Sequence, residues 1–173
     1  MRCAVVGAGA WGTALASLLA ENEHEVMLWA YEADVAESVN GEHENRRFLE
    51  GVPLHPALRA SSALETACAG AELVLFAPPS HVLRQVAGQA ARWITEGATL
   101  VVATKGIERE RLALMTDVVA EEVRGRPIVA LSGPSFALEV AHHLPTAIVA
   151  ASNDPAAALR TQQAFSTSAF RVY

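Results

Sequence analysis

A glycine-rich hexapeptide, Gly7-Ala8-Gly9-Ala10-Trp11-Gly12, constrains the fold of this chain more than any other feature. It follows an apolar segment, 3–6, and precedes an Ala- and Leu-rich segment, 11–21, typical of a helix. In such a pattern Gly7 permits a tight turn, Gly9 lets the backbone approach a pyrophosphate, and Gly12 lets the helix pack closely on the strand. The helix start then offers free N–H groups to phosphates. The sequence therefore predicts a dinucleotide-binding βαβ unit.

An acidic residue follows the second expected strand, 25–29, at the spacing that a dinucleotide site requires. Glu32 lies about twenty positions beyond Gly12, where a carboxylate binds the 2′-hydroxyl of the adenosine ribose and favours NAD. No basic residue stands next to Glu32 in the sequence. We therefore expect NAD or NADP to bind, with weak discrimination and a preference for NAD(H). Tyr31 is expected to pack on the adenine, although Glu32 as a solvated turn residue is an alternative.

Short apolar runs alternate with helical patterns along the whole chain. The runs are almost entirely apolar, as expected where helices cover both faces of a parallel sheet. The sequence thus predicts a Rossmann-like, doubly wound, mostly parallel α/β sheet. The expected strands are 3–6, 25–29, 73–77, 99–103, 128–131 and, with unassigned direction, 146–151 and 169–173. The expected helices are 11–21, 34–39, 63–69, 81–93, 112–123, 136–142 and 155–165.

Local signals add three further expectations. Ser62 with Glu65 three residues later predicts a capping box. Asp154 before Pro155 predicts an N-cap followed by proline in the first helical turn. Segment 40–59 is polar and then bears prolines, which predicts a long surface excursion, and such loops are often functional.

The one lysine of the sequence, Lys105, lies in the segment Thr104-Lys105-Gly106, which follows the expected strand 99–103. The carboxyl ends of parallel strands face the crevice where doubly wound sheets bind ligands. The Lys105 ammonium is a compact charge that suits a phosphate or a polarised carbonyl. An ordinary surface lysine is the alternative.

A second strand–glycine–helix layout occurs at 132–137, Ser-Gly-Pro-Ser-Phe-Ala. Ser135 is a good N-cap residue, and the same geometry would present its hydroxyl to an anion. The segment also resembles the nucleophile elbow of a serine hydrolase, with Ala137 in place of the second glycine. No sequence motif identifies a histidine that would act as the general base for Ser135, so a serine hydrolase is a distant alternative.

Composition excludes several classes of partner. The net charge of −6 disfavours nucleic acid, and no apolar run reaches the ~18 residues that a membrane span needs. Cys3 and Cys68 are too few for a disulfide framework, which fits a cytoplasmic protein. The histidines and cysteines show no metal-ligand spacing, so we expect no metal. Glycines within 3–20 argue against a signal peptide there.

Several motifs together resemble the bacterial type of NAD(P)-dependent glycerol-3-phosphate dehydrogenase. The resemblance extends from Cys3 to Tyr173 and identifies the chain with the amino-terminal coenzyme-binding domain of that family. The motifs that carry it are 7–16, 25–29, 45–49 (Asn-Arg-Arg-Phe-Leu), 78–81 (Pro-Pro-Ser-His), 104–108 (Thr-Lys-Gly-Ile-Glu) and 132–137.

The resemblance also implies roles for individual residues. Those that would line the coenzyme site, besides the glycine motif, are Ala10, Trp11, Tyr31, Lys105 and Ala137. Those that would meet the phosphate or carbonyl end of the substrate are Lys105, Gly133 and Ser135. The family often has serine at position 10 and histidine or arginine at position 31, which weakens any preference for NADPH.

The implied reaction is hydride transfer between the nicotinamide and dihydroxyacetone phosphate or sn-glycerol 3-phosphate. The resemblance implies that the product is used for phospholipid synthesis. The family continues into a helical second domain that carries the lysine taken as proton acceptor. We expect that domain to be absent from this chain, with 1–173 forming one Rossmann domain that binds coenzyme but is poorly active. A homodimer is compatible with the resemblance. A stand-alone NAD(P)-binding sensor is the alternative.

Overall fold

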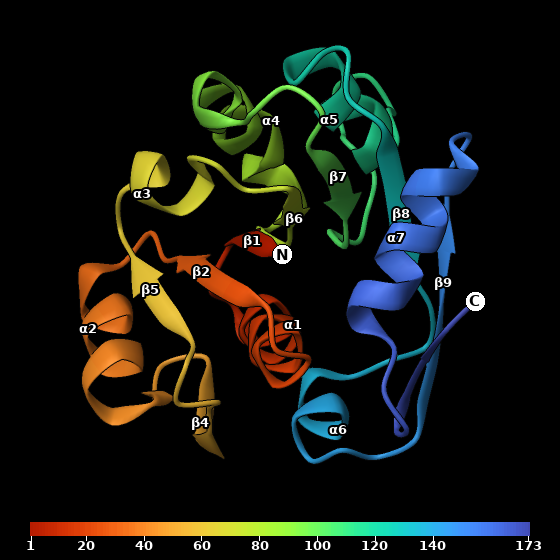
Figure 1. Ribbon diagram of the computed structural model, residues 1–173. Coiled ribbons are helices and arrows are strands. Elements are labelled where there is room, and N and C mark those ends of the chain that lie inside the picture. Colours follow the sequence, from red (N-terminus) through yellow and green to blue (C-terminus); the bar gives the residue numbers. More distant parts are fainter.

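The seven segments expected as strands, together with an unpredicted strand at 59–61, form one eight-stranded sheet in the computed structural model, which describes residues 1–173 (Figure 1). The order across the sheet is β10-β9-β8-β7-β6-β1-β2-β5. These strands are β1 (Arg2–Val6), β2 (Glu25–Trp29), β5 (Arg59–Ser61), β6 (Leu73–Phe76), β7 (Thr99–Val102), β8 (Ile128–Ser132), β9 (Thr146–Ala151) and β10 (Phe170–Val172).

Helices cover both faces of the sheet, as the apolar strands predicted. Because side chains alternate between faces along a strand, Cys3 and Val5 of β1 belong to one core and Ala4 and Val6 to the other. The first core is shared with α1 (Ala10–Glu21), α2 (Ala33–Glu42), α6 (Ala137–Ala141) and α7 (Pro155–Phe165). The second is shared with α3 (Leu64–Cys68), α4 (Ser80–Ala90) and α5 (Met115–Glu122). A short 3-10 helix, Ala91–Trp93, extends α4.

The chain order reverses beside the central strand. β1 pairs in parallel with β2 on one side and with β6 on the other. Chain progression then runs outward through β7 and β8 on the β6 side and through β5 on the β2 side. In doubly wound sheets such a reversal opens a crevice at the carboxyl ends of the strands, where ligands bind. The expected Rossmann-like architecture is confirmed.

The structure assigns the two strands whose direction the sequence left open. β9 runs antiparallel to β8, and β10 runs parallel to β9. Alternate residues of β9 are buried and exposed, with Val149 50% exposed. This pattern is typical of strands with one face in water. Because β9 runs antiparallel to β8, the sheet is mostly and not entirely parallel.

Segment 40–59 lies largely at the surface, as its polar sequence predicted, but it has secondary structure that the sequence did not predict. It contains the antiparallel ribbon β3 (Glu44–Asn45) and β4 (Leu49–Pro53) and leads into β5. Leu49, Val52 and Leu54 are each at most 5% exposed and join the core beside α1. These few apolar residues are enough to hold the structured part of the segment against the helix.

The two predicted helix caps had opposite outcomes. The N-cap at Asp154 is confirmed, since its Oδ1 accepts the N–H groups of Ala156 at 2.9 Å and Ala157 at 3.2 Å. The capping box at Ser62 is wrong, because α3 begins at Leu64 and its N-cap residue, Ala63, makes no side-chain cap bond.

Helix α5 begins at Met115, three residues later than expected. Leu112 has φ of 55°, outside the helical region. Ile107 forms a β-bridge with Leu114, which keeps the preceding turn out of the helix. This turn therefore closes a loop after β7 in place of a first helical turn.

Both cysteines are fully buried in the core. Burial raises the pKa of the Cys3 and Cys68 thiols to about 12, so both thiols are protonated at neutral pH, in keeping with a packing role. No helix is both long enough and apolar enough to cross a bilayer.

We expect Asp154→Ala to lower the free energy of unfolding by ~1 kcal/mol, because two N–H groups at the start of α7 lose their acceptor. Urea denaturation monitored by circular dichroism measures the loss. Ser62→Ala is the control and should change stability by less than ~0.5 kcal/mol. Equal losses in the two variants would contradict this assignment of caps.

Candidate functional site

Two of the motif glycines are required by backbone packing. Gly7 has φ of 117°, and a Cβ atom on it would lie 2.7 Å from the Pro78 nitrogen. A Cβ atom on Gly12 would collide with the carbonyl oxygen of Gly7. These glycines therefore let α1 start directly against β1 and the turn after β6, as the motif predicted.

Gly9 is different, because a Cβ atom on it would meet no protein atom within 4 Å. Gly9 is the N-cap of α1, and no side chain caps this end. The first helical bond is donated by the N–H of Thr13 to the Gly9 carbonyl at 2.9 Å. The N–H groups before Thr13 in the helix thus have no acceptor within it. The turn fits a bound pyrophosphate, which would occupy the space that a side chain at Gly9 would fill.

Asn45 holds this turn in place from the neighbouring ribbon. Its side chain is fully buried, and its Nδ2 donates to the Ala8 carbonyl and to the Thr13 Oγ1, both at 2.8 Å. Its Oδ1 accepts the N–H of Phe48 at 3.1 Å. The sequence indicates no role for Asn45 beyond its place in one motif, since the residues that its Nδ2 binds are 32 to 37 positions away.

Two cavities meet at Gly9, Pro78 and Pro79 and form one groove across the carboxyl ends of the central strands. The first has a volume of about 540 Å³, and the second about 370 Å³. Residues lining the first include Gly7, Trp29, Tyr31, Glu32, Phe48 and Gln89. Residues lining the second include Ala10, Trp11, Thr104, Lys105, Ser135 and Ala137. The groove lies where β1 and β6 adjoin, at the predicted crevice.

The first cavity contains both residues predicted for the adenosine end. The Tyr31 ring is 81% exposed and meets the Trp29 ring edge-on, with centroids 6.3 Å apart. Glu32 is half-buried and provides the backbone N-cap of α2. Phe48, from the ribbon, also lines this cavity, which the sequence did not predict.

The ribbon also brings a basic residue to Glu32. Arg47 Nη2 lies 3.9 Å from Glu32 Oε1, and Arg47 Nη1 lies 3.7 Å from Asp34 Oδ2. The expected preference for NAD(H) assumed that no basic residue stood beside Glu32. That assumption holds along the chain but not in space, because α2 and the turn after β3 bring Arg47 back to the end of β2.

The second cavity gathers residues from four segments, which follow β1, β6, β7 and β8. Lys105 is the only lysine in the chain and is exposed. Its Nζ donates to the Gly133 carbonyl at 3.3 Å and lies 5.7 Å from the centroid of the Trp11 ring. Ser135 and Ala137 line the same cavity. The structure therefore brings together the residues that the sequence assigned to the substrate end.

Gly133 and Ser135 have structural roles that differ from the sequence expectations. A Cβ atom on Gly133 would lie 2.9 Å from the Ile148 backbone, so close strand approach explains this glycine. Ser135 is not the N-cap of α6, which begins one residue after Phe136. Its hydroxyl donates to the Gly133 carbonyl at 3.4 Å and contacts no histidine or carboxylate, so nothing supports the hydrolase alternative.

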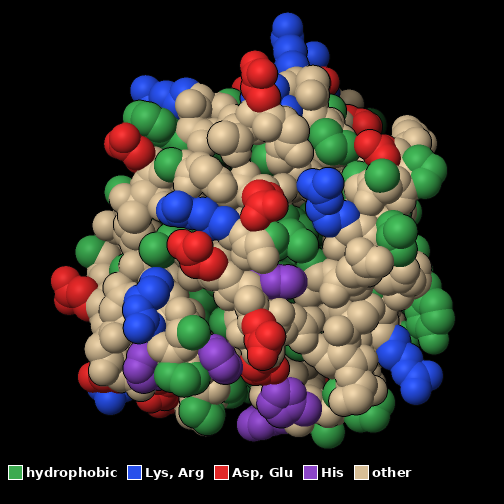
Figure 2. All heavy atoms as spheres, viewed as in Figure 1, with side chains coloured by type: hydrophobic (Ala, Val, Ile, Leu, Met, Phe, Trp, Pro, Cys, Tyr) green, Lys and Arg blue, Asp and Glu red, His purple; other side chains and the backbone are tan.

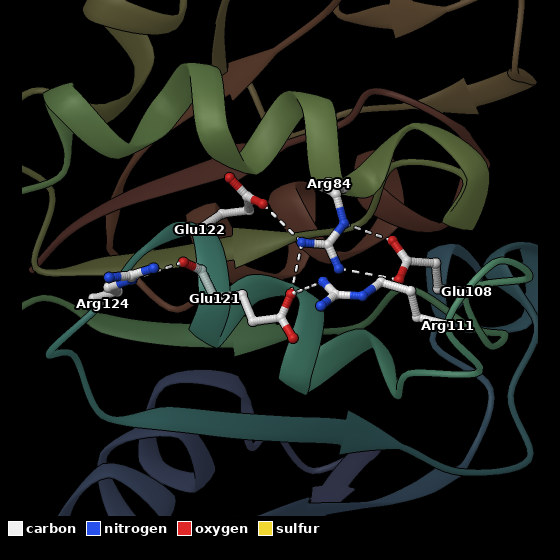
Figure 3. A network of polar contacts seen from close by, with 6 residues as sticks. All are labelled: Arg84, Glu108, Arg111, Glu121, Glu122 and Arg124. Carbon is white, nitrogen blue, oxygen red and sulfur yellow. Dashed lines mark hydrogen bonds and ion pairs between the residues drawn. The ribbon is translucent and has the colours of Figure 1, made fainter.

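An ion-pair network fixes the loop that carries Lys105 (Figure 3). Arg84, on α4, donates to both carboxylate oxygens of Glu108, at 2.6 and 3.0 Å. The same guanidinium reaches Glu121 and Glu122 of α5, each at 2.8 Å. Hydrogen bonds from Arg84 hold the pKa of the Glu108 carboxyl below its usual value. The loop after β7 is thus tied to two helices.

Charges of both signs are intermingled on the face drawn in Figure 1, as Figure 2 shows. Histidine side chains gather at the bottom of this view, over β4 and α6. His142 and His143 lie there beside a third cavity of about 270 Å³, separate from the groove. His142 is the C-cap of α6, which agrees with the expected helix end.

The comparisons with known proteins agree with this geometry. Residues 2–158 match the model of the NAD-dependent glycerol-3-phosphate dehydrogenase N-terminus. A glycerol-3-phosphate dehydrogenase [NAD(P)+] of Geobacter sulfurreducens is 46% identical over 99% of this chain and 52% of its own length. The relative of the same name from Myxococcus xanthus is 42% identical over 100% of this chain and 52% of its length.

A solved structure gives the same result. The crystal structure of glycerol-3-phosphate dehydrogenase from Coxiella burnetii superposes with a TM-score of 0.93 at 35% identity, covering 99% of this chain and 53% of that one. This chain spans about half the length of the relatives it matches.

The fold and the glycine turn define a domain of the Rossmann dinucleotide-binding class. Within that class, the chain belongs to the NAD-dependent glycerol-3-phosphate dehydrogenase family and corresponds to its N-terminal region.

We expect Gly9→Val to abolish coenzyme binding without unfolding the domain, because a Cβ atom there has no protein atom within 4 Å and the side chain would fill the pyrophosphate space. Titration calorimetry with NADH and NADPH measures the loss. Gly41→Val, also at an unobstructed position, is the control and should bind normally. A folded Gly9→Val variant with unchanged affinity would sink the assignment of the turn.

We expect the Arg84–Glu108 pair to make stability depend on pH. Because the pKa of Glu108 is lowered in the folded state, its contribution is present above the unfolded value of 4.5 and is lost as pH falls through the folded value. Urea unfolding of Glu108→Gln should show a stability deficit at pH 7 that shrinks toward pH 3. The control, Glu110→Gln, should show no such trend. A deficit independent of pH would argue against the pair.

Proposed function

We propose that this chain is the coenzyme-binding half of a glycerol-3-phosphate dehydrogenase and that its groove takes NAD(H) or NADP(H). The observation that carries the proposal is the uncapped, unobstructed start of α1 at Gly9, which opens into both cavities. Family membership and the relatives' printed names support the coenzyme class.

The groove sets the direction in which the coenzyme would lie. The free N–H groups at the start of α1 would bind the pyrophosphate. Tyr31 and Glu32 would then contact the adenosine, with the Glu32 carboxylate accepting a ribose hydroxyl. The opposite end would extend past Ala10 and Trp11 toward Ala137. When bound, the nicotinamide supplies or accepts the hydride.

Lys105 is the residue of this chain that we assign to the substrate. Its ammonium, held by the Gly133 carbonyl, would bind the phosphate of dihydroxyacetone phosphate or polarise its carbonyl. The Ser135 hydroxyl lines the same cavity and would donate to the same end of the substrate. The Arg84–Glu108 pair fixes the Lys105 loop, so the backbone that carries the ammonium is positioned before the substrate arrives.

Proton transfer is assigned to the part of the family outside this chain. The relatives are about twice as long, and the resemblance places the proton acceptor in their helical second domain. A positioned acid–base group contributes typically ~10²–10⁴-fold to rate. We therefore propose that residues 1–173 bind coenzyme but reduce dihydroxyacetone phosphate poorly. In the complete enzyme, a cytoplasmic role in supplying sn-glycerol 3-phosphate for phospholipids follows from the same resemblance.

We expect a chimera of residues 1–173 with the second half of the Geobacter sulfurreducens relative to reduce dihydroxyacetone phosphate at least ~100-fold faster than the chain alone. Loss of nicotinamide absorbance measures both rates. In the chimera, Lys105→Met should lower turnover far more than coenzyme affinity, whereas Arg109→Met, an exposed cation on the same loop, should leave both near normal.

Three outcomes would oppose the proposal. Full activity of residues 1–173 alone would return the proton donor to this half. Coenzyme binding by a folded chimera without turnover would favour the sensor module. Normal turnover in Lys105→Met would remove that residue from the substrate site.

A further inference from the structure

Arg47 lies beside Glu32 at the rim of the adenosine end of the groove; it lines neither cavity itself and has no strong partner. Its distances to the Glu32 and Asp34 carboxylates, 3.9 and 3.7 Å, exceed hydrogen-bond length. Its side chain is 54% exposed. The guanidinium therefore keeps donors free, and moving it breaks no close hydrogen bond.

Arg47 packs over Phe48, a residue that lines the groove. The guanidinium carbon lies 5.3 Å from the centroid of the Phe48 ring, in a cation–π arrangement. Phe48 lines the same cavity as Glu32, and its N–H is held by the buried Asn45. Asn45, which holds the glycine turn, thus also holds the segment that carries Arg47.

The acidic and basic side chains at this rim would favour different coenzymes. A free 2′-hydroxyl would donate to the Glu32 carboxylate, and Arg47 would stay beside the two acids. A 2′-phosphate would be repelled by Glu32 and Asp34, but it would offer Arg47 a bidentate, charge-assisted partner better than either carboxylate at its present distance.

We propose that Arg47 determines acceptance of NADP(H) at this site, by transferring its guanidinium from Glu32 and Asp34 to the 2′-phosphate, while Glu32 serves NAD(H). The proposal rests on the proposed function, because it assumes that the groove holds a dinucleotide. It assigns to the ribbon a selectivity that is conventionally sought at the end of β2.

Arg46 offers a matched control. It is the adjacent residue and carries the same charge, yet its Nε is already 3.0 Å from Glu42 and 3.5 Å from Glu44. Like Arg47, it lines neither cavity of the groove, but its carboxylate partners are Glu42 and Glu44 and not Glu32. Removing the Arg46 charge tests whether any positive charge on the ribbon is sufficient for NADPH binding.

The experiment is titration of the chain and its variants with NADPH and with NADH at low and high salt. We expect Arg47→Gln to weaken NADPH binding about tenfold while changing NADH binding by less than about twofold. Arg46→Gln should change neither by more than about twofold. Glu32→Gln should raise the NADPH-to-NADH affinity ratio. Added salt should weaken NADPH binding more than NADH binding in the unmodified chain, and this difference should vanish in Arg47→Gln.

A folded Arg47→Gln variant that keeps the NADPH-to-NADH affinity ratio within about twofold would overturn the role of Arg47 and leave the proposed function standing. An equal effect of Arg46→Gln would overturn it too, since the selectivity would then come from general charge. Failure of the unmodified chain to bind either coenzyme would instead overturn the proposed function, and this inference with it.

Discussion

The close approach of two backbones at the glycine turn is the constraint on which the rest of the site depends. Helix α1 starts so near β1 that Gly12 lies against the carbonyl of Gly7, and Gly7 lies against the backbone at Pro78. This contact places the free N–H groups of α1 at the junction of β1 and β6. Any side chain at these two positions would push the helix away and move the phosphate-binding end with it. Of the three glycines in the turn, only Gly9 has no neighbouring protein atom that excludes a side chain. The absence of a side chain there therefore points to a ligand.

The ribbon after α2 extends this constraint to the adenosine end. Asn45 uses its amide nitrogen on the glycine turn and its amide oxygen on the N–H of Phe48, so one buried side chain links the two segments. A polar group this deeply buried is tolerated because both ends of its amide are hydrogen-bonded. Phe48 therefore lines the groove, with Arg47 beside it, on a fixed support within a segment whose sequence predicts a surface excursion.

The other end of the groove is positioned by charge as well as by apolar packing. Arg84 holds the loop after β7 through Glu108 and anchors it to α5 through Glu121 and Glu122. The Lys105 ammonium on that loop then depends on only one weak bond, to the Gly133 carbonyl. The scaffold is thus rigid while the functional charge itself stays free to meet a ligand, which suits a residue that must exchange its partner for a substrate.

The sequence by itself determined seven of the eight strands of the sheet, the glycine turn and the N-cap at Asp154, because each depends on neighbours within a few residues or on periodic burial. It also selected Lys105 and Glu32, since strand ends in a parallel sheet share one edge. Only the tertiary structure decided the antiparallel direction of β9, the ribbon and the approach of Arg47 to Glu32. These depend on contacts between residues far apart in the chain, where Asn45 and a few buried leucines outweigh a locally polar sequence.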